Sequence, residues 1–158
     1  MKKYLSFVLA SLMLILSLTA CGEKAPKEVT ASAADLAKQL TETVSDGTLA
    51  ADPVVSDILA STYFVDMEQV EESAAYMSTG ATASEVAVIK CTDSSYASEV
   101  EDLFKSRVES QSELFASYAP DEVKKLDAAV IKVSGNYVVL CVTDDTSKAE
   151  SILEKAGF

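Results

Sequence analysis

The sequence of 158 residues contains no histidine, and this absence excludes several kinds of chemistry. Ser-His-Asp and Cys-His nucleophiles need an imidazole that accepts a proton, so neither arrangement is possible. A metal centre with histidine ligands is excluded for the same reason. The acidic residues also lack the spacing of a calcium-binding loop, so we expect no metal site and no cofactor. Hydrolases that use a pair of carboxylates or a Ser-Lys pair remain possible.

Basic residues are scarce as well, with 13 lysines and arginines against 25 aspartates and glutamates. The formal net charge is therefore −12 at pH 7. Nucleic acids and anionic lipid head groups are bound by basic surfaces. We therefore expect no nucleic-acid partner and no direct adhesion of the folded domain to an anionic membrane.

An apolar, uncharged run follows Lys2 and Lys3 and extends from residue 4 to residue 20. A basic start, an apolar stretch and small residues before a cleavage point are typical of a secretory signal. The run is marginal in length for a membrane-spanning helix. The alternatives to a lipoprotein signal are an ordinary signal peptide, or an uncleaved anchor, with an incidental cysteine.

The run closes with Leu18-Thr19-Ala20-Cys21, which resembles a bacterial lipobox. This resemblance implies cleavage before Cys21 and a diacylglyceryl group on its sulfur, often with a further acyl chain on the new amino terminus. Two or more acyl chains anchor a protein stably, whereas one chain holds it only marginally. We therefore predict a lipid-anchored protein on the extracytoplasmic face of the cell membrane, with Cys21 as the lipidation site.

The composition divides the chain into three parts. Residues 1–20 are the expected signal peptide, residues 21–31 the lipidated cysteine with a flexible tether, and residues 32–158 a single globular domain. Removal of residues 1–20 takes the formal net charge from −12 to −14, because Lys2 and Lys3 are lost. The 138 remaining residues suffice for one domain with a real core but not for two.

Helical spacing and turn residues predict the first half of the domain. A helix begins near Ser32 and ends at Asp46-Gly47, and a shorter one begins at Asp52-Pro53 with proline in the first turn. The segment 67–77 fits a helix or a strand, and we favour a strand for its second half. A turn near Gly80 then leads into a strand over residues 86–89.

The second half of the domain is clearer. Residues 94–118 form a long amphipathic helix whose apolar stripe comprises Val100, Leu103, Phe104, Val108, Leu114 and Phe115. About one turn of helix follows from Pro120, and Gly135-Asn136 joins strands over residues 130–133 and 137–142 as a tight hairpin. Ser147 and Glu150 have the spacing of a capping box, so the last helix should begin near Ser147.

The segment 88–95 resembles the segment 139–146, since both run from an apolar strand through Thr-Asp into a helix. This repetition predicts an α+β domain with an antiparallel sheet of about four strands, built from possible tandem ββα units and packed against helices on at least one face. The Thr-Asp pairs should cap the helices that follow rather than hold a metal.

Cys91 and Cys141 are the two cysteines that remain after Cys21. Export to an oxidising compartment makes a disulfide between them conceivable. In the repeat, however, Cys91 matches Val142 and Cys141 matches Lys90, so alternation places the two thiols on opposite faces of the sheet. We therefore expect buried free thiols rather than a bridge.

Arg107 and Gln111 interrupt the apolar side of the long helix, and Tyr118 continues the same face. They are the candidate contacts for an anionic ligand or for the carboxylate of a partner. The alternative is structural: Arg107 pairs with a carboxylate or backbone carbonyls of the domain itself, and Gln111 is a satisfied partner. The sequence offers no catalytic residue.

Several short segments together resemble an uncharacterised family of small Gram-positive lipoproteins, classed only as a domain of unknown function. They are the lipobox, the strand over residues 85–90, Arg107-Val108 with Gln111, residues 115–118, and the hairpin over residues 135–138. The resemblance implies an envelope lipoprotein with no assigned activity and supplies no catalytic residues.

These observations favour a membrane-anchored binding or accessory module of the cell envelope over an enzyme. Its partners would be the membrane, through the lipid on Cys21, and an envelope protein or wall component. The alternatives are a small carboxylate-dependent hydrolase acting on envelope material, and an inhibitor-like or structural protein. A pair of carboxylates held about 5–9 Å apart in a cleft would favour the hydrolase.

Overall fold

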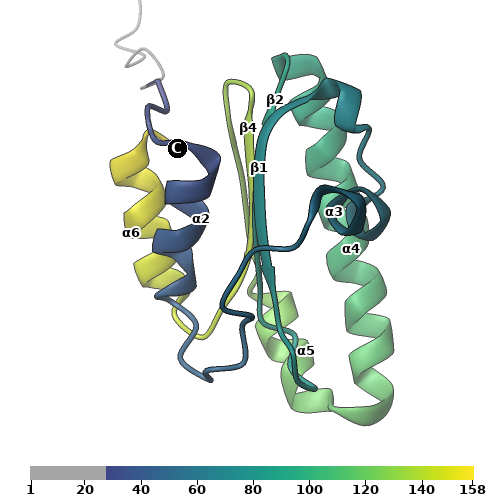
Figure 1. Cartoon of the computed structure of the whole chain (residues 1–158). Helices are drawn as coiled ribbons and strands as arrows, with labels where there is room; N and C mark the ends of the chain where they lie inside the picture. The colour runs from purple at the N-terminus through teal and green to yellow at the C-terminus, as the bar shows by residue number, and fades with distance from the viewer. Residues whose placement is uncertain (1–27) are drawn as a thin grey trace, which may run out of the picture.

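The computed structural model describes residues 28–158, so the lipobox and Cys21 lie outside the described residues. A four-stranded sheet stands between two layers of helices (Figure 1). The elements follow one another as α2 (Ala33–Thr41), α3 (Ser56–Tyr63), the 3-10 turn η1 (Met67–Gln69), β1 (Val70–Met77), β2 (Glu85–Cys91), α4 (Ser94–Tyr118), α5 (Pro120–Asp127), β3 (Val130–Ser134), β4 (Tyr137–Val142) and α6 (Thr146–Ala156). The predicted single α+β domain with an antiparallel sheet of four strands is confirmed.

The sheet consists of two hairpins joined along their inner strands, in the order β1-β2-β4-β3. All neighbouring strands are antiparallel, and Val88 of β2 pairs with Val139 of β4 at the centre of the sheet. Gly135 takes a φ of +58° in the tight turn between β3 and β4, as the Gly-Asn pair predicted. The two inner strands are the most buried, because each has a neighbour on both sides and helices over both faces.

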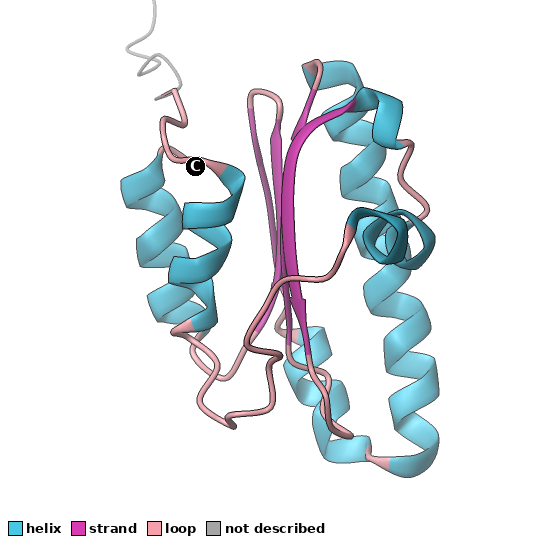
Figure 2. Ribbon diagram, viewed as in Figure 1, coloured by secondary structure: helices cyan, strands magenta, loops and turns pink. Residues whose placement is uncertain are grey.

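Helices α2 and α6 cover one face of the sheet, and α3, α4 and α5 cover the other (Figure 2). Side chains alternate between the two layers along each strand. In β2, Ala87 and Ile89 face α4, whereas Val86 and Val88 face α2 and α6. The inner strands are continuous apolar runs because side chains on both of their faces are buried beneath helices.

The two ββα units differ in the direction that their helices take. A twofold axis perpendicular to the sheet relates the antiparallel β2 and β4, and it would place both following helices on one face. Instead α4 covers one face and α6 the other (Figure 1). The repetition is thus real for the strands but does not extend to the helices, because inner strands that are apolar on both sides need cover on both sides.

The helix expected from Asp52-Pro53 begins later than predicted, at Ser56. The amide of Val54 donates a hydrogen bond to the carbonyl of Ala75 in β1, at 2.8 Å. The segment before the helix is therefore held extended along the edge of the sheet, and proline does not occupy the first turn.

Three further details correct the sequence-based expectations. Helix α5 has 8 residues rather than about one turn, because Leu126 packs into the core and holds its second turn. The cap of α6 is Asp145, whose carboxylate accepts a hydrogen bond from the Lys148 amide, rather than Ser147. Leu114, assigned to the buried stripe of α4, is 52% exposed, because the core lies beneath its neighbour Phe115.

The Thr-Asp pairs fulfil the predicted capping role only in part. Asp93 caps α4 by accepting hydrogen bonds from the amides of Ser95 and Tyr96. Asp144 instead accepts a hydrogen bond from the amide of Ser45, on a segment distant in sequence. At the start of the described chain, Val29 packs against the α2 side of the core, within the segment expected to be tether.

Candidate binding face between α3 and α4

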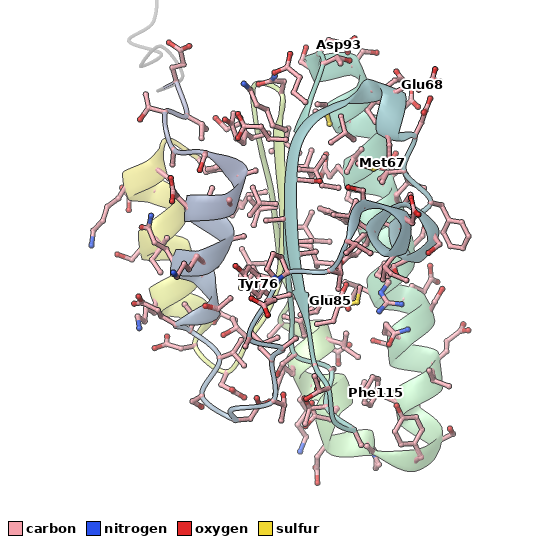
Figure 3. The ribbon with its side chains drawn as sticks, viewed as in Figure 1. Met67, Glu68, Tyr76, Glu85, Asp93 and Phe115 are labelled. Carbon is pink, nitrogen blue, oxygen red and sulfur yellow. The ribbon has the colours of Figure 1, made fainter. Side chains whose placement is uncertain are left out.

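Arg107 lies on the side of α4 that faces the sheet and forms a two-point ion pair with Glu85. Its Nε donates to Oε1 at 3.3 Å and its Nη2 donates to Oε2 at 2.9 Å. Glu85 is the first residue of β2, is 5% exposed, and lies between the sheet and the α3–α4 layer (Figure 3). A carboxylate of the domain itself thus holds the guanidinium in place.

Tyr63, the last residue of α3, lies beside this ion pair. Its ring meets the ring of Phe104 edge to face, with the centroids 5.2 Å apart. Its hydroxyl is buried and makes no hydrogen bond to any of residues 28–158. Burial raises the pKa of Tyr63 well above its usual value, and the negative charge of Glu85 raises it further. The hydroxyl therefore stays protonated.

The three residues predicted to contact a ligand do not form one site. Gln111 is half-buried one turn beyond Arg107, whereas Tyr118 is 53% exposed at the far end of α4. The Tyr118 ring lies against the ring of Phe115 at a tilt of 36°, with the centroids 5.0 Å apart. Arg107 and Tyr118 are eleven residues apart, or about 16 Å along a helix axis. The structure therefore brings Arg107 together with Glu85 and Tyr63, and leaves Tyr118 apart.

A small cavity of about 110 Å³ opens on the surface beside Arg107. It is lined by Thr62, Phe64, Leu103, Ser106, Arg107 and Ser110. Ser106 and Ser110 lie one turn apart on α4, and their small side chains leave the hollow between α3 and α4. The cavity has room for a single small side chain of a partner.

Phe64 forms one wall of this cavity and is exposed in an unusual backbone conformation. It follows α3 with a φ of 58° and a ψ of 32°, and its side chain is 81% exposed. Within residues 28–158 it is the only residue other than glycine with a positive φ. This left-handed conformation costs an ordinary residue about 1–2 kcal/mol. The sequence gives no signal for it, because Tyr63-Phe64-Val65 reads simply as an apolar run.

Exposed acidic side chains surround this face. On α3, the following turn and α4 they are Asp57, Asp66, Glu68, Glu99, Asp102, Glu109 and Glu113. The exposed cation of the same segments, Lys105, lies 2.9 Å from Glu101 and 3.0 Å from Asp102. The charge of Arg107 is balanced internally by Glu85. The face as a whole is therefore negative, with an apolar centre.

The chain matches the family described as "Domain of unknown function (DUF4358)" over residues 45–143, which is more than half of its length. The chain belongs to the DUF4358 family. The match includes all four strands and the helices α3, α4 and α5, so the candidate face lies within it, whereas α2 and α6 lie outside. The comparisons with curated proteins and with solved structures give no match.

A second cluster of polar residues in the DUF4358 domain surrounds Lys125. Its ammonium lies 3.0 Å from Asp144, 3.2 Å from Asp46 and 3.4 Å from Glu122. It also donates a hydrogen bond to the hydroxyl of Ser84, at 3.0 Å. This cluster tests the two hydrolase types that the sequence left possible, because it contains both a Ser-Lys pair and grouped carboxylates.

The protonation states in this cluster suit an ion network better than catalysis. Burial by itself would lower the pKa of Lys125, but hydrogen bonds and attraction from the carboxylates, above all Asp144 and Asp46, raise it. Burial would raise the pKa of Asp46 and of Asp144, but the hydrogen bonds that they accept lower both. A Ser-Lys nucleophile needs a neutral lysine, which the raised pKa of Lys125 disfavours. The lowered pKa values of Asp46 and Asp144 likewise disfavour a protonated general acid at these two positions.

A wider hollow of about 320 Å³ lies at the opposite end of the sheet, between Glu28 and the β3–β4 turn. Lys90 on its wall is 2.9 Å from Glu71 and 3.6 Å from Glu72. Its ammonium also lies 5.8 Å from the centre of the Tyr137 ring. The cation in this hollow is therefore already paired.

The two cysteines face opposite sides of the sheet, as the repetition predicted. Cys91 belongs to the core cluster beneath α4, and Cys141 to the cluster beneath α2 and α6. Both are free and buried, and burial raises the pKa of each thiol to about 11. Neither cysteine is therefore suited to act as a nucleophile.

Residues 28–158 contain no group of three or more acidic or cysteine side chains placed to hold a metal ion. None of the helices in this part of the chain is both long and apolar enough to span a membrane.

Proposed function

We propose that the protein is a lipid-anchored, extracytoplasmic lipoprotein of the cell envelope, held to the membrane by acyl chains on Cys21. The support is the basic and apolar start of the chain and the lipobox at residues 18–21. A tether of a few residues, at most about 3.5 Å each, would keep the domain close to the membrane.

Replacement Cys21→Ser tests the anchor. The variant should leave the membrane fraction or accumulate with its leader uncleaved, and metabolic labelling with a fatty acid should no longer mark it. A cysteine of the folded domain, Cys91→Ser, serves as the control and should keep the label. A Cys21→Ser protein that remains processed and bound to membranes would show that the anchor is wrong.

We further propose that the domain is a binding module and that its binding surface is the face between α3 and α4. The observation that carries this proposal is Phe64, a large aromatic side chain that is 81% exposed on a strained backbone. Strain of this kind persists where surrounding structure enforces it, and it is concentrated at functional positions. Exposed aromatic residues are also frequent anchors of protein interfaces.

The position of the face agrees with this role. The described chain begins on the α2 side of the sheet, where Val29 packs, and α3 and α4 cover the other side (Figure 1). A tether that emerges on one side leaves the opposite side free to contact a partner. Exposed Val55, which directly precedes α3, and exposed Ile58, on α3, extend the apolar centre of the face.

Photo-crosslinking in intact membranes tests the binding surface. Incorporation of p-benzoylphenylalanine in place of Phe64 should give a discrete adduct with one envelope protein, because the probe keeps the aromatic shape. The same probe in place of Val133, which is 37% exposed on the outer strand β3, is the control and should give none. Absence of an adduct at position 64, or equal adducts at both positions, would refute this binding surface.

The replacement Phe64→Gly separates binding from folding. Glycine adopts a positive φ without the Cβ penalty, so the free energy of unfolding should rise by about 0.5–1 kcal/mol. In a competition assay, purified Phe64→Gly protein is added to the membranes that carry the probe at position 64. The added variant should not reduce the adduct, whereas added unmodified protein should reduce it. Thermal unfolding and the competition assay measure the two effects separately. A variant that competes normally would show that the ring does not bind.

A further inference from the structure

We infer that the partner of the α3–α4 face is a cationic protein surface with an apolar pocket that receives the ring of Phe64. This inference rests on the proposed function and adds the chemistry of the partner. It depends on three features of the described residues: the apolar centre of the face, the charge around it, and the internal pairing of its cations.

The apolar centre is a projecting side chain rather than a groove. Phe64 is 81% exposed, and the cavity beside it is only about 110 Å³, too small for an aromatic side chain of a partner. An aromatic ring that projects from one protein gains most by entering a pocket on the other. The partner is therefore expected to supply the pocket, and this face the anchor.

The exposed charges around the anchor are mostly negative. Glu109 and Glu113 lie one turn apart on α4, next to the cavity residues Ser106 and Ser110, and Asp57 lies in the first turn of α3. All three carboxylates are exposed. A rim of one sign directs a partner of the opposite sign to the face and repels one of the same sign.

The cations of the face are not available to offset this rim. Lys105 is paired with Glu101 and Asp102, and Arg107 with Glu85. A second copy of the chain would bring the same negative face, and an anionic lipid surface would also be repelled. The charge pattern thus favours a different protein rich in lysine and arginine around its pocket.

Reversal of the rim charge tests the inference in the same crosslinking experiment. Glu109→Lys combined with Glu113→Lys should reduce the adduct formed at position 64 by at least about fivefold, because attraction becomes repulsion. When Glu109 and Glu113 are unchanged, a rise in salt from about 0.1 M to about 0.5 M should also reduce the amount of adduct formed at position 64, because salt screens the attraction. Mass spectrometry of the adduct should place the crosslink in a segment with apolar residues flanked by lysine or arginine.

A matched pair of charge reversals on α5 controls for net charge. Asp121→Lys with Asp127→Lys changes the total charge by the same amount on exposed residues outside this face, and should leave the adduct within about twofold. Circular dichroism should show that both double variants are folded. The replacement keeps a like-charge pair one turn apart but places a lysine four residues after Lys105, so thermal unfolding of both double variants should be compared with that of the unmodified protein.

The outcomes distinguish the two proposals. An adduct that is insensitive to salt and to the reversal on α4 would overturn the cationic partner while leaving a binding module in place. An adduct with lipid, with a second copy, or within the same chain would also overturn it. If no adduct formed at position 64, the proposed binding surface would be refuted, and this inference with it.

Discussion

Arg107 and Glu85 form the ion pair that lies between the sheet and α4, beside the cavity between α3 and α4. Each brings a charge to the boundary between the sheet and α4, where the side chain of Glu85 is only 7% exposed. A charge in such surroundings is stable only when a partner compensates it. The two-point contact provides that compensation and also aligns α4 with the first residue of β2.

Arg107→Met should lower the free energy of unfolding by about 3–5 kcal/mol, because Glu85 would then be buried without its cation. Urea denaturation at neutral pH measures this loss. The double replacement Arg107→Met with Glu85→Leu removes both charges and should recover most of the stability. A loss below about 1 kcal/mol for the single variant would mean that Glu85 does not depend on Arg107.

Helix α4, with 25 residues, covers one face of the sheet together with α3 and α5 and supplies one side of the proposed binding face. Asp93 caps its amino terminus through two hydrogen bonds of 2.8 and 2.9 Å to backbone amides. Such a cap satisfies donors that have no partner inside the helix, and its charge interacts favourably with the helix dipole. The start of α4 is therefore fixed where β2 ends.

Asp93→Ala should reduce the free energy of unfolding by about 1 kcal/mol, because two amides at the start of α4 lose their acceptor. Glu109→Ala, on the exposed side of the same helix, is the control and should change it by less than about 0.5 kcal/mol. Chemical denaturation of the two variants measures the difference. Equal effects would show that the cap contributes nothing beyond an ordinary surface carboxylate.

At the scale of the whole molecule, Lys125 connects segments that are remote in sequence. It joins α5 to the turn after α2 through Asp46, to the end of β4 through Asp144, and to the start of β2 through Ser84. Its side chain is only 12% exposed. The network therefore ties together α5, the turn after α2, the end of β4 and the start of β2 at one end of the sheet.

Lys125→Met should lower the free energy of unfolding by about 2–4 kcal/mol at pH 7, because three carboxylates lose their shared cation. In the unmodified protein, Asp46 and Asp144 have lowered pKa values. Their contribution is present above the unfolded pKa of about 3.9 and is lost as the pH falls through their lower native values. Without Lys125 the carboxylates repel one another and bind protons more readily, so acid relieves the defect.

The deficit of Lys125→Met relative to the unmodified protein should therefore shrink as the pH falls below about 4, through the lowered native pKa values of Asp46 and Asp144. Denaturation curves across this range measure it. The neighbouring variant Lys124→Met is the control, because Lys124 is 82% exposed and its pair with Asp121 should contribute little. A deficit that stays constant or grows with acid would contradict the network.

Local sequence patterns determined much of the fold. The spacing of apolar residues predicted α4 with its observed bounds, and Gly135-Asn136 predicted the β3–β4 hairpin, because helix period and turn geometry depend on neighbouring residues. The repetition around Cys91 and Cys141 also predicted their opposite faces, since alternation along a strand is a local property. The lipid anchor at Cys21 stays a prediction from the lipobox, which lies outside the described residues.

Contacts between distant segments decided the rest. The side of the sheet that α6 covers, the delayed start of α3 and the pairing of Arg107 with Glu85 each depend on residues far away in sequence. The same is true of Phe64, whose positive φ and exposure arise where the chain turns from α3 towards the sheet. The sequence therefore determined most elements and their periodicity, because these depend on neighbouring residues, whereas only the tertiary structure decided which distant side chains meet and which remain exposed.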